Sequence, residues 1–158
     1  MNFYSPSKGR LSFDATFEDL VSYINKNSEE NYKLIIGSDS QAFLNEKVTF
    51  VTAIIVHRVG KGGRYYFQKR KQRYMESIKQ RIFHETSLSL EVASRLTDKL
   101  AQNGYADLNI EIHLDVGEKG ETREIIKEVV GMVIGSGYDA RIKPHSYGAT
   151  KVADKYTK

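Results

Sequence analysis

The order of apolar segments predicts an α/β fold: a mixed five-stranded sheet with helices on both faces and an extra N-terminal helix. Segments rich in β-branched and aromatic residues follow one another at residues 33–39, 48–59 and 64–71. They predict a three-stranded antiparallel meander, because a glycine-rich turn joins the last two. Two further strands are expected at 108–116 and 138–143. Each follows a helical segment, and a strand that returns after a helical crossover lies parallel to its partner.

Four segments have helical periodicity. The first helix is expected from Thr16, where Asp19 completes a capping-box pattern ahead of an apolar stripe. A long helix is expected over residues 76–102, and shorter ones over 121–134 and 147–157. The apolar residues of the long segment recur at steps close to one helical turn, which predicts that one face of this helix packs against the sheet.

The length and composition indicate one globular domain. A chain of 158 residues can bury its own core. We expect residues 1–158 to form a single domain, with residues 1–31 as a helical extension. The absence of cysteine excludes disulfides and thiolate metal sites. The first residues lack the apolar stretch of a signal peptide, and no apolar run is long enough to cross a bilayer. We therefore expect a cytoplasmic protein without a membrane partner.

Positive charge is concentrated in one segment of the chain. The net charge is +4, but residues 58–81 carry +8, with Glu76 as their single acid. The candidate nucleic-acid contacts there are Arg64, Lys69, Arg70, Lys71 and Arg73. Aromatic residues are interleaved with them, and such rings can stack on bases while the cations follow phosphates. The alternative is a solvated edge strand protected by its cations, with the aromatic rings in the core.

Four acids lie where predicted elements begin or end. Asp39 ends the first strand of the meander, Asp115 ends the fourth strand, and Glu85 and Asp154 lie in the long and the last helix. Asp39 and Asp115 become neighbours if the first and fourth strands pair, because the carboxyl ends of parallel strands meet at one edge of a sheet. A single Asp at a strand end is more often a turn or cap residue. Four acids placed in this way favour a metal site.

The long helix offers two candidate acids, Glu85 and Glu91. The residues three, four, seven and eleven positions after Glu85 are largely apolar, whereas the same steps from Glu91 reach polar residues. Glu85 should therefore point toward the sheet, and Glu91 should be exposed and pair with Arg95. An acid on a buried face is unfavourable unless a charge or a metal compensates it. This argument assigns the metal-site role to Glu85.

Several stretches of the sequence resemble a known family. GSDSQ, VTAIIVHRVGKGGRYY, ETSLSLEVA, HLDV and VADKYTK are similar to the bacterial YkuK family, which is described as ribonuclease H-like. The likeness covers residues 32–158. The strand order and the places of the four acids also resemble those of the ribonuclease H superfamily. His145 precedes Asp154 by nine residues, a distance similar to that of the loop histidine in ribonuclease H enzymes.

The resemblance implies a metal-dependent nuclease that acts on RNA, DNA or a hybrid of the two. Mg²⁺ or Mn²⁺ would be held by Asp39, Glu85, Asp115 and Asp154, and His145 would act near the product phosphate. Two ions roughly 3.5–4 Å apart suit phosphodiester hydrolysis. The sequence has no tryptophan and carries an extra N-terminal helix, which separates it from the well-known hybrid-cleaving enzymes. A non-catalytic nucleic-acid-binding module and a protein-interaction module on the same fold remain alternatives.

A zinc site is a further alternative. His113 and Asp115 lie two residues apart on one strand, which places both side chains on the same face. Together with His57 or His84 they would supply the nitrogen and oxygen ligands that zinc accepts. A histidine that is hydrogen-bonded within the structure is the more ordinary interpretation of His113.

Overall fold

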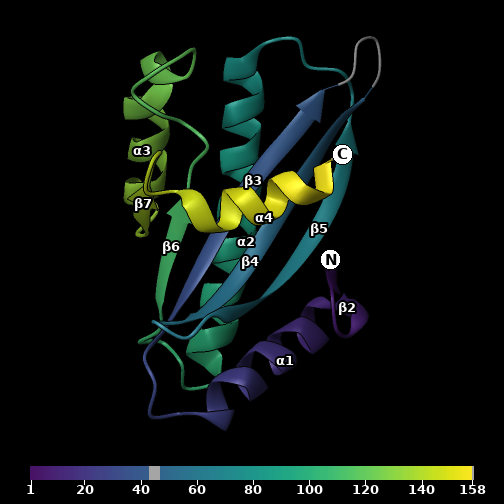
Figure 1. Ribbon diagram of the computed structural model, residues 1–158, viewed down its shortest axis with the longest axis vertical. Helices are drawn as coiled ribbons and strands as arrows, with labels where there is room; N and C mark the ends of the chain where they lie inside the picture. Colours follow the sequence, from purple (N-terminus) through teal and green to yellow (C-terminus); the bar gives the residue numbers. More distant parts are fainter. Residues whose placement is uncertain (43–46, 158) are drawn as a thin grey trace.

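The computed structural model describes residues 1–42 and 47–157, and its sheet has the strand order β2-β1-β5-β4-β3-β6-β7 (Figure 1). The strands are β1 (Asn2–Ser5), β2 (Gly9–Ser12), β3 (Tyr32–Ala42), β4 (Val48–Arg58), β5 (Gly63–Gln72), β6 (Asn109–His113) and β7 (Asp139–Arg141). The helices are α1 (Phe13–Lys26), α2 (Ile78–Gln102), α3 (Ile126–Gly135) and α4 (Tyr147–Thr157), and a short 3₁₀ turn, η1 (Arg123–Ile125), precedes α3.

The mixed α/β architecture is confirmed. Strands β3, β4 and β5 form the antiparallel meander, β6 pairs in parallel with β3, and β7 pairs in parallel with β6. The predicted count of five strands is wrong, because the sheet has seven. The two additional strands, β1 and β2, form an antiparallel hairpin beside β5. The hairpin continues the sheet beyond the strand that the sequence predicts to be its edge.

The N-terminal hairpin is held by burial and by a glycine turn. Phe3 is fully buried in the main core, and Tyr4 lies opposite Phe67 of β5. Gly9 has a φ of +73°, a conformation that glycine adopts without the steric penalty of a side chain. A strand of four residues is too short for its alternation to stand out in the sequence, which predicts a helical extension over residues 1–31 without these strands.

Helix α1 begins earlier than the sequence predicts. Ser12 is its N-cap, and the Ser12 Oγ accepts a hydrogen bond from the Ala15 amide at 3.0 Å. Thr16, the predicted start, lies within the first turn, where its hydroxyl donates to the Ser12 carbonyl at 2.8 Å. The earlier start follows from capping chemistry, because a serine side chain accepts a hydrogen bond from a free amide at a helix start as well as a threonine side chain does.

The helices form two layers around the sheet. Helices α1, α2 and α3 cover one face and enclose the main core, which includes Leu34, Ile36, Val92 and Leu96. Helix α4 crosses the other face alone (Figure 1) and packs Ala153 against β4. Within the described residues, no helix combines the length and the apolar character that crossing a membrane requires. The sheet thus lies between a thick helical layer and a single helix, and the candidate site forms where α2, α4 and the strand ends meet.

Candidate active site

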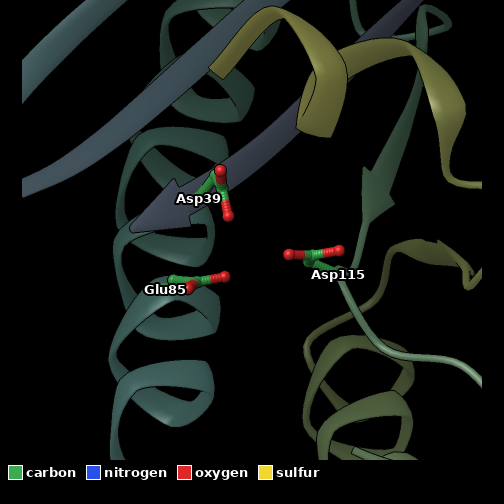
Figure 2. Close-up of side chains that lie close together, drawn as sticks. All are labelled: Asp39, Glu85 and Asp115. Atoms are coloured by element: carbon green, nitrogen blue, oxygen red, sulfur yellow. The ribbon is translucent and has the colours of Figure 1, made fainter. Parts of the chain in front are cut away.

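Strand register brings two of the predicted acids together. Strands β3 and β6 are parallel, and Gly37 lies opposite His113. Asp39 and Asp115 each follow two residues later, so they lie side by side. The prediction that Asp39 ends its strand is wrong, because β3 continues to Ala42, whereas Asp115 does follow the end of β6. Glu85 reaches the two aspartates from α2 (Figure 2). One carboxylate oxygen from each of Asp39, Glu85 and Asp115 lies within 4.8 Å of the others. We call these three residues the acid cluster.

Glu85 points toward the sheet, as the helical spacing predicts. It is only 5% exposed, and its Oε2 accepts a hydrogen bond from the Ser40 hydroxyl at 2.6 Å. Glu91 is exposed on the same helix, also as predicted. The predicted pairing of Glu91 with Arg95 is wrong, because Glu91 forms an ion pair with Arg70 of β5 at 3.5 Å. Helical spacing fixes which face an acid occupies but not which strand residue lies opposite that face.

Asp154 approaches the acid cluster from α4. Its side chain is in hydrogen-bonding contact with that of Asp39, and it borders a cavity of about 680 Å³ that Asp39, Glu85 and Asp115 also line. Asp154 itself is exposed, and the three mutually close oxygens belong to the other acids. The structure therefore gathers all four predicted acids around one cavity, with Asp154 at its rim.

The acids at the base of the cavity are held in an environment that disfavours their charge. Burial, the charge of Asp115 and the contact with Asp154 raise the pKa of Asp39 from its ordinary 3.8 to about 8. Burial also raises the pKa of Glu85 well above its usual value, and the negative charges of Asp39 and Asp115 add to this effect, against the opposing hydrogen bond from Ser40. A divalent cation placed among these oxygens would offset the unfavourable charge.

Three cations also line the cavity, and the sequence does not single them out as site residues. The Lys143 ammonium lies 2.7 Å from Asp115 Oδ1. Arg81 donates from Nε to the Ser40 hydroxyl and from Nη2 to the Ser40 carbonyl, both at 3.1 Å. Lys151 of α4 completes the set. Arg81 precedes Glu85 by one helical turn, and this spacing was the one sequence signal that could have placed it at the site.

Comparison with known proteins identifies the family. The family model described as Ribonuclease H-like matches residues 15–158. The chain belongs to this family. It is 35% identical to "Uncharacterized protein YkuK" of Bacillus subtilis (strain 168), over 99% of this chain and 96% of that protein. No solved structure matches the chain significantly. The predicted likeness to a YkuK-type, ribonuclease H-like protein is thereby confirmed.

The histidine that the ribonuclease H resemblance singles out lies outside the cavity lining. His145 is exposed in the segment between β7 and α4, and its backbone amide donates to the Ile142 carbonyl at 2.7 Å. The neighbouring residues Pro144 and Ser146 do line the cavity. A role of the His145 side chain near a product phosphate stays a prediction.

The predicted basic contacts of this ribonuclease H-like chain divide between the two faces of the sheet. Lys69 lies opposite Val51, which in turn lies opposite Asp39, so Lys69 and Lys71 share the face that carries Asp39 and α4. Arg70 lies on the other face with Glu91. Arg64 pairs with Asp19 at 3.1 Å near the far end of β5. Arg73, which follows the strand, is exposed.

Most of the interleaved aromatic residues are used in packing. Tyr66 is fully buried, and its hydroxyl donates to Asp19 at 2.6 Å. Phe67 stacks on Tyr156 of α4 with ring centroids 3.7 Å apart. Tyr74 is 40% exposed. The core interpretation of these aromatics therefore holds for Tyr66 and Phe67, and it leaves Tyr74 as the exposed ring.

The zinc alternative gains no support from the described residues. His113 is buried, and its Nε2 lies 3.1 Å from Glu111 Oε1. Within residues 1–42 and 47–157, the one group of three potential metal ligands close enough to share an ion is the acid cluster, which contains no histidine. Carboxylate oxygens without nitrogen or sulfur ligands favour hard cations over zinc.

Proposed function

We propose that this protein is a metal-dependent nuclease that hydrolyses phosphodiester bonds of nucleic acids. The observation that carries the proposal is the acid cluster: three carboxylates from β3, α2 and the segment after β6 approach within 4.8 Å beside an open cavity. Membership of the ribonuclease H-like family supports it. The alternatives are a nucleic-acid-binding module and a protein-interaction module without catalytic activity, and cleavage separates both from the nuclease.

The donor set of the cavity fits Mg²⁺ or Mn²⁺. Both prefer oxygen ligands, and Mg²⁺ retains several waters, so a few carboxylates are enough. Asp39 and Glu85 are buried, and burial raises the pKa of both, which a divalent cation would offset. The spacing of up to 4.8 Å suits ligands of one ion or of two ions about 3.5–4 Å apart. When bound, such ions would supply an activated water and stabilise the negative charge of the leaving oxygen.

The side chains of the cavity would divide the work by position. Asp39 lies on the central strand β3 and faces both Asp115 and Asp154, so it would be the residue best placed to hold metal together with each of them. Glu85 is oriented by the Ser40 hydroxyl. Asp115 is oriented by the Lys143 ammonium. His145 would act outside the lining, near the departing phosphate.

The face of the sheet beside the cavity would carry the nucleic acid. Asp39, Val51 and Lys69 form one row across three adjacent strands. Because neighbouring strands lie about 4.8 Å apart, the backbone of Lys69 is roughly 10 Å from that of Asp39. That distance corresponds to one or two nucleotides of a bound strand. Lys69, Lys71 and Arg73 would contact phosphates beyond the cleaved bond, whereas Arg64 and Arg70 are engaged with carboxylates.

A cleavage screen tests the proposal. The protein is incubated with Mg²⁺ or Mn²⁺ and with labelled DNA duplex, RNA duplex, single strands and hybrid, and products are resolved by gel. Asp39→Asn should lower metal-dependent cleavage at least about 1,000-fold, because an amide is a poor ligand for a hard cation. Circular dichroism should show an unchanged fold.

The matched control is Asp107→Asn, which alters an exposed acid away from the cavity and should leave cleavage unchanged. Cleavage retained by Asp39→Asn would rule out the assigned site. Nucleic-acid binding without cleavage of any substrate would favour the non-catalytic module.

A further inference from the structure

Arg81 stands at the cavity in an arrangement that leaves part of its guanidinium available. Its Nε and Nη2 are fixed on the hydroxyl and the carbonyl of Ser40. Within the described part of the chain, Nη1 has no hydrogen-bond partner, and no carboxylate oxygen comes within ion-pair distance of the side chain. Two bonds to a strand end hold the planar group in place, which lowers the entropy that a further contact must overcome.

Two other half-buried arginines of this protein are paired with acids. Arg64 pairs with Asp19, and Arg70 pairs with Glu91. Arg81 differs although three acids line the same cavity. It also lies in the first turns of α2, where no acid balances the positive end of the helix dipole. An anion bound at Arg81 would offset both the unpaired charge and the dipole.

The charges of the cavity point to the conditions under which that anion binds. Asp39, Glu85, Asp115 and Asp154 outnumber Arg81, Lys143 and Lys151, so the lining is formally anionic when metal is absent. One divalent ion reverses the sign of the formal charge, and a second makes the cavity strongly cationic. The cavity then attracts an anion such as a phosphodiester, and it holds a guanidinium already oriented to receive one.

We propose that Arg81 forms a phosphate-binding subsite for a nucleic-acid strand, next to the acid cluster, and that metal loading of the cluster promotes its occupancy. The proposal rests on the proposed function, because it assigns the strand whose cleavage the acids would catalyse. Arg81 contacts a nonbridging phosphate oxygen through Nη1. The Ser40 hydroxyl accepts from Arg81 Nε and donates to Glu85, so it fixes the positions of both side chains. Arg81 is thus a substrate-binding residue.

The test measures nucleic-acid and metal binding separately. Fluorescence anisotropy follows a labelled DNA duplex and a labelled single-stranded RNA in Ca²⁺, and calorimetry follows Mn²⁺ without nucleic acid. Arg81→Gln should weaken oligonucleotide binding about tenfold and flatten the log–log salt slope by about 0.9 on the duplex and about 0.7 on the single strand. Mn²⁺ binding should stay equal or tighten, because a positive charge near the cation has been removed.

Lys79→Gln is the matched control, since it removes a charge from the same helix turn at a residue that pairs with Glu128 and does not line the cavity. It should leave both measurements unchanged. An unchanged salt slope in Arg81→Gln overturns the inference, and so does a joint loss of Mn²⁺ and oligonucleotide binding, which would mean that Arg81 only supports Ser40 and Glu85. If the wild type binds no Mn²⁺, the proposed function fails and the inference fails with it.

Discussion

Two glutamates of this protein are almost equally buried, but their surroundings shift their pKa values in opposite directions. Glu85 is 5% exposed and Glu111 is 4% exposed. Glu111 lies beside Lys33 at 3.2 Å, His113 at 3.1 Å and Arg141 at 3.6 Å. Burial works to raise its pKa, but the hydrogen bonds from His113 and Lys33 and the nearby positive charges outweigh burial and lower that pKa. Glu85 accepts a hydrogen bond from one hydroxyl group, that of Ser40, and burial raises its pKa.

The difference separates a structural acid from a candidate functional one. The charge of Glu111 is already compensated within the fold, so this residue has no need of a metal and little capacity to bind one. Glu85 shares its surroundings with Asp39 and Asp115, and the negative charges of these two residues add to the effect of burial on its pKa. Burial alone therefore identifies neither role. The partner of the buried carboxylate decides which role it takes.

The largest expected effect is on metal binding. Glu85→Gln should weaken Mn²⁺ binding at least about 100-fold, because it removes a carboxylate from the acid cluster. Glu111→Gln should leave Mn²⁺ binding within about twofold, since Glu111 contacts cations rather than the cavity. Glu91→Gln, on the exposed face of α2, should have no effect. Isothermal titration calorimetry on the three variants measures the affinities. Loss of binding in Glu91→Gln with retention in Glu85→Gln would mean that α2 is rotated about its axis.

The helix acid is also the part of the site that sequence reasoning places best. Periodicity predicts that Glu85 faces the sheet and that Glu91 does not, because the apolar residues on α2 define one face unambiguously. Strand order predicts the approach of Asp39 and Asp115, because parallel neighbours end at one edge. These inferences use spacing along a regular element, and the regular geometry of helices and strands makes such spacing informative.

Contacts between elements are less predictable. The hydrogen bonds of Arg81 and Glu85 with Ser40 depend on the position of α2 along the direction of β3. Residue spacing within either element does not determine that position. The N-terminal hairpin is missed for another reason, since each of its strands has only four residues. The separation of Arg70 from Lys69 and Lys71 follows from strand alternation and could have been predicted from the sequence.

Stability against pH should separate the two kinds of buried acid in the metal-free protein. The pKa of Asp39 is about 8 in the folded state and 3.8 ordinarily. Folding then favours its protonated form, so this contribution is fully present below about pH 4 and is lost as the pH rises toward 8. The pKa of Glu111 is lowered, so its contribution is present above its ordinary pKa of 4.5 and is lost as the pH falls through its folded value.

Urea denaturation in EDTA at pH 4 and pH 8 measures this difference. Asp39→Asn should raise the free energy of unfolding at pH 8 by about 1–3 kcal/mol and change it little at low pH. Glu111→Gln should lower it at pH 8 by a similar amount, about 1–3 kcal/mol, because Lys33 and Arg141 lose their shared partner. A lower free energy of unfolding for Asp39→Asn at pH 8 would contradict the view that the charged acid cluster destabilises the metal-free protein.

The smallest expected effect concerns β5, where the same comparison is made between cations that pair with an acid and cations that do not. Lys69 and Lys71 share a face with Asp39, whereas Arg70 lies on the opposite face and pairs with Glu91. If an unpaired charge marks a functional residue, Lys69→Gln combined with Lys71→Gln should reduce the salt slope of duplex binding by up to about 1.8, at about 0.9 for each phosphate that is no longer neutralised. Arg70→Gln removes a charge from the same strand and should leave the slope unchanged. Anisotropy titrations over a range of salt concentrations provide both slopes. An equal reduction in Arg70→Gln would mean that net charge, rather than the face of the sheet, governs binding, and it would remove the argument that nucleic acid crosses the strands beside α4.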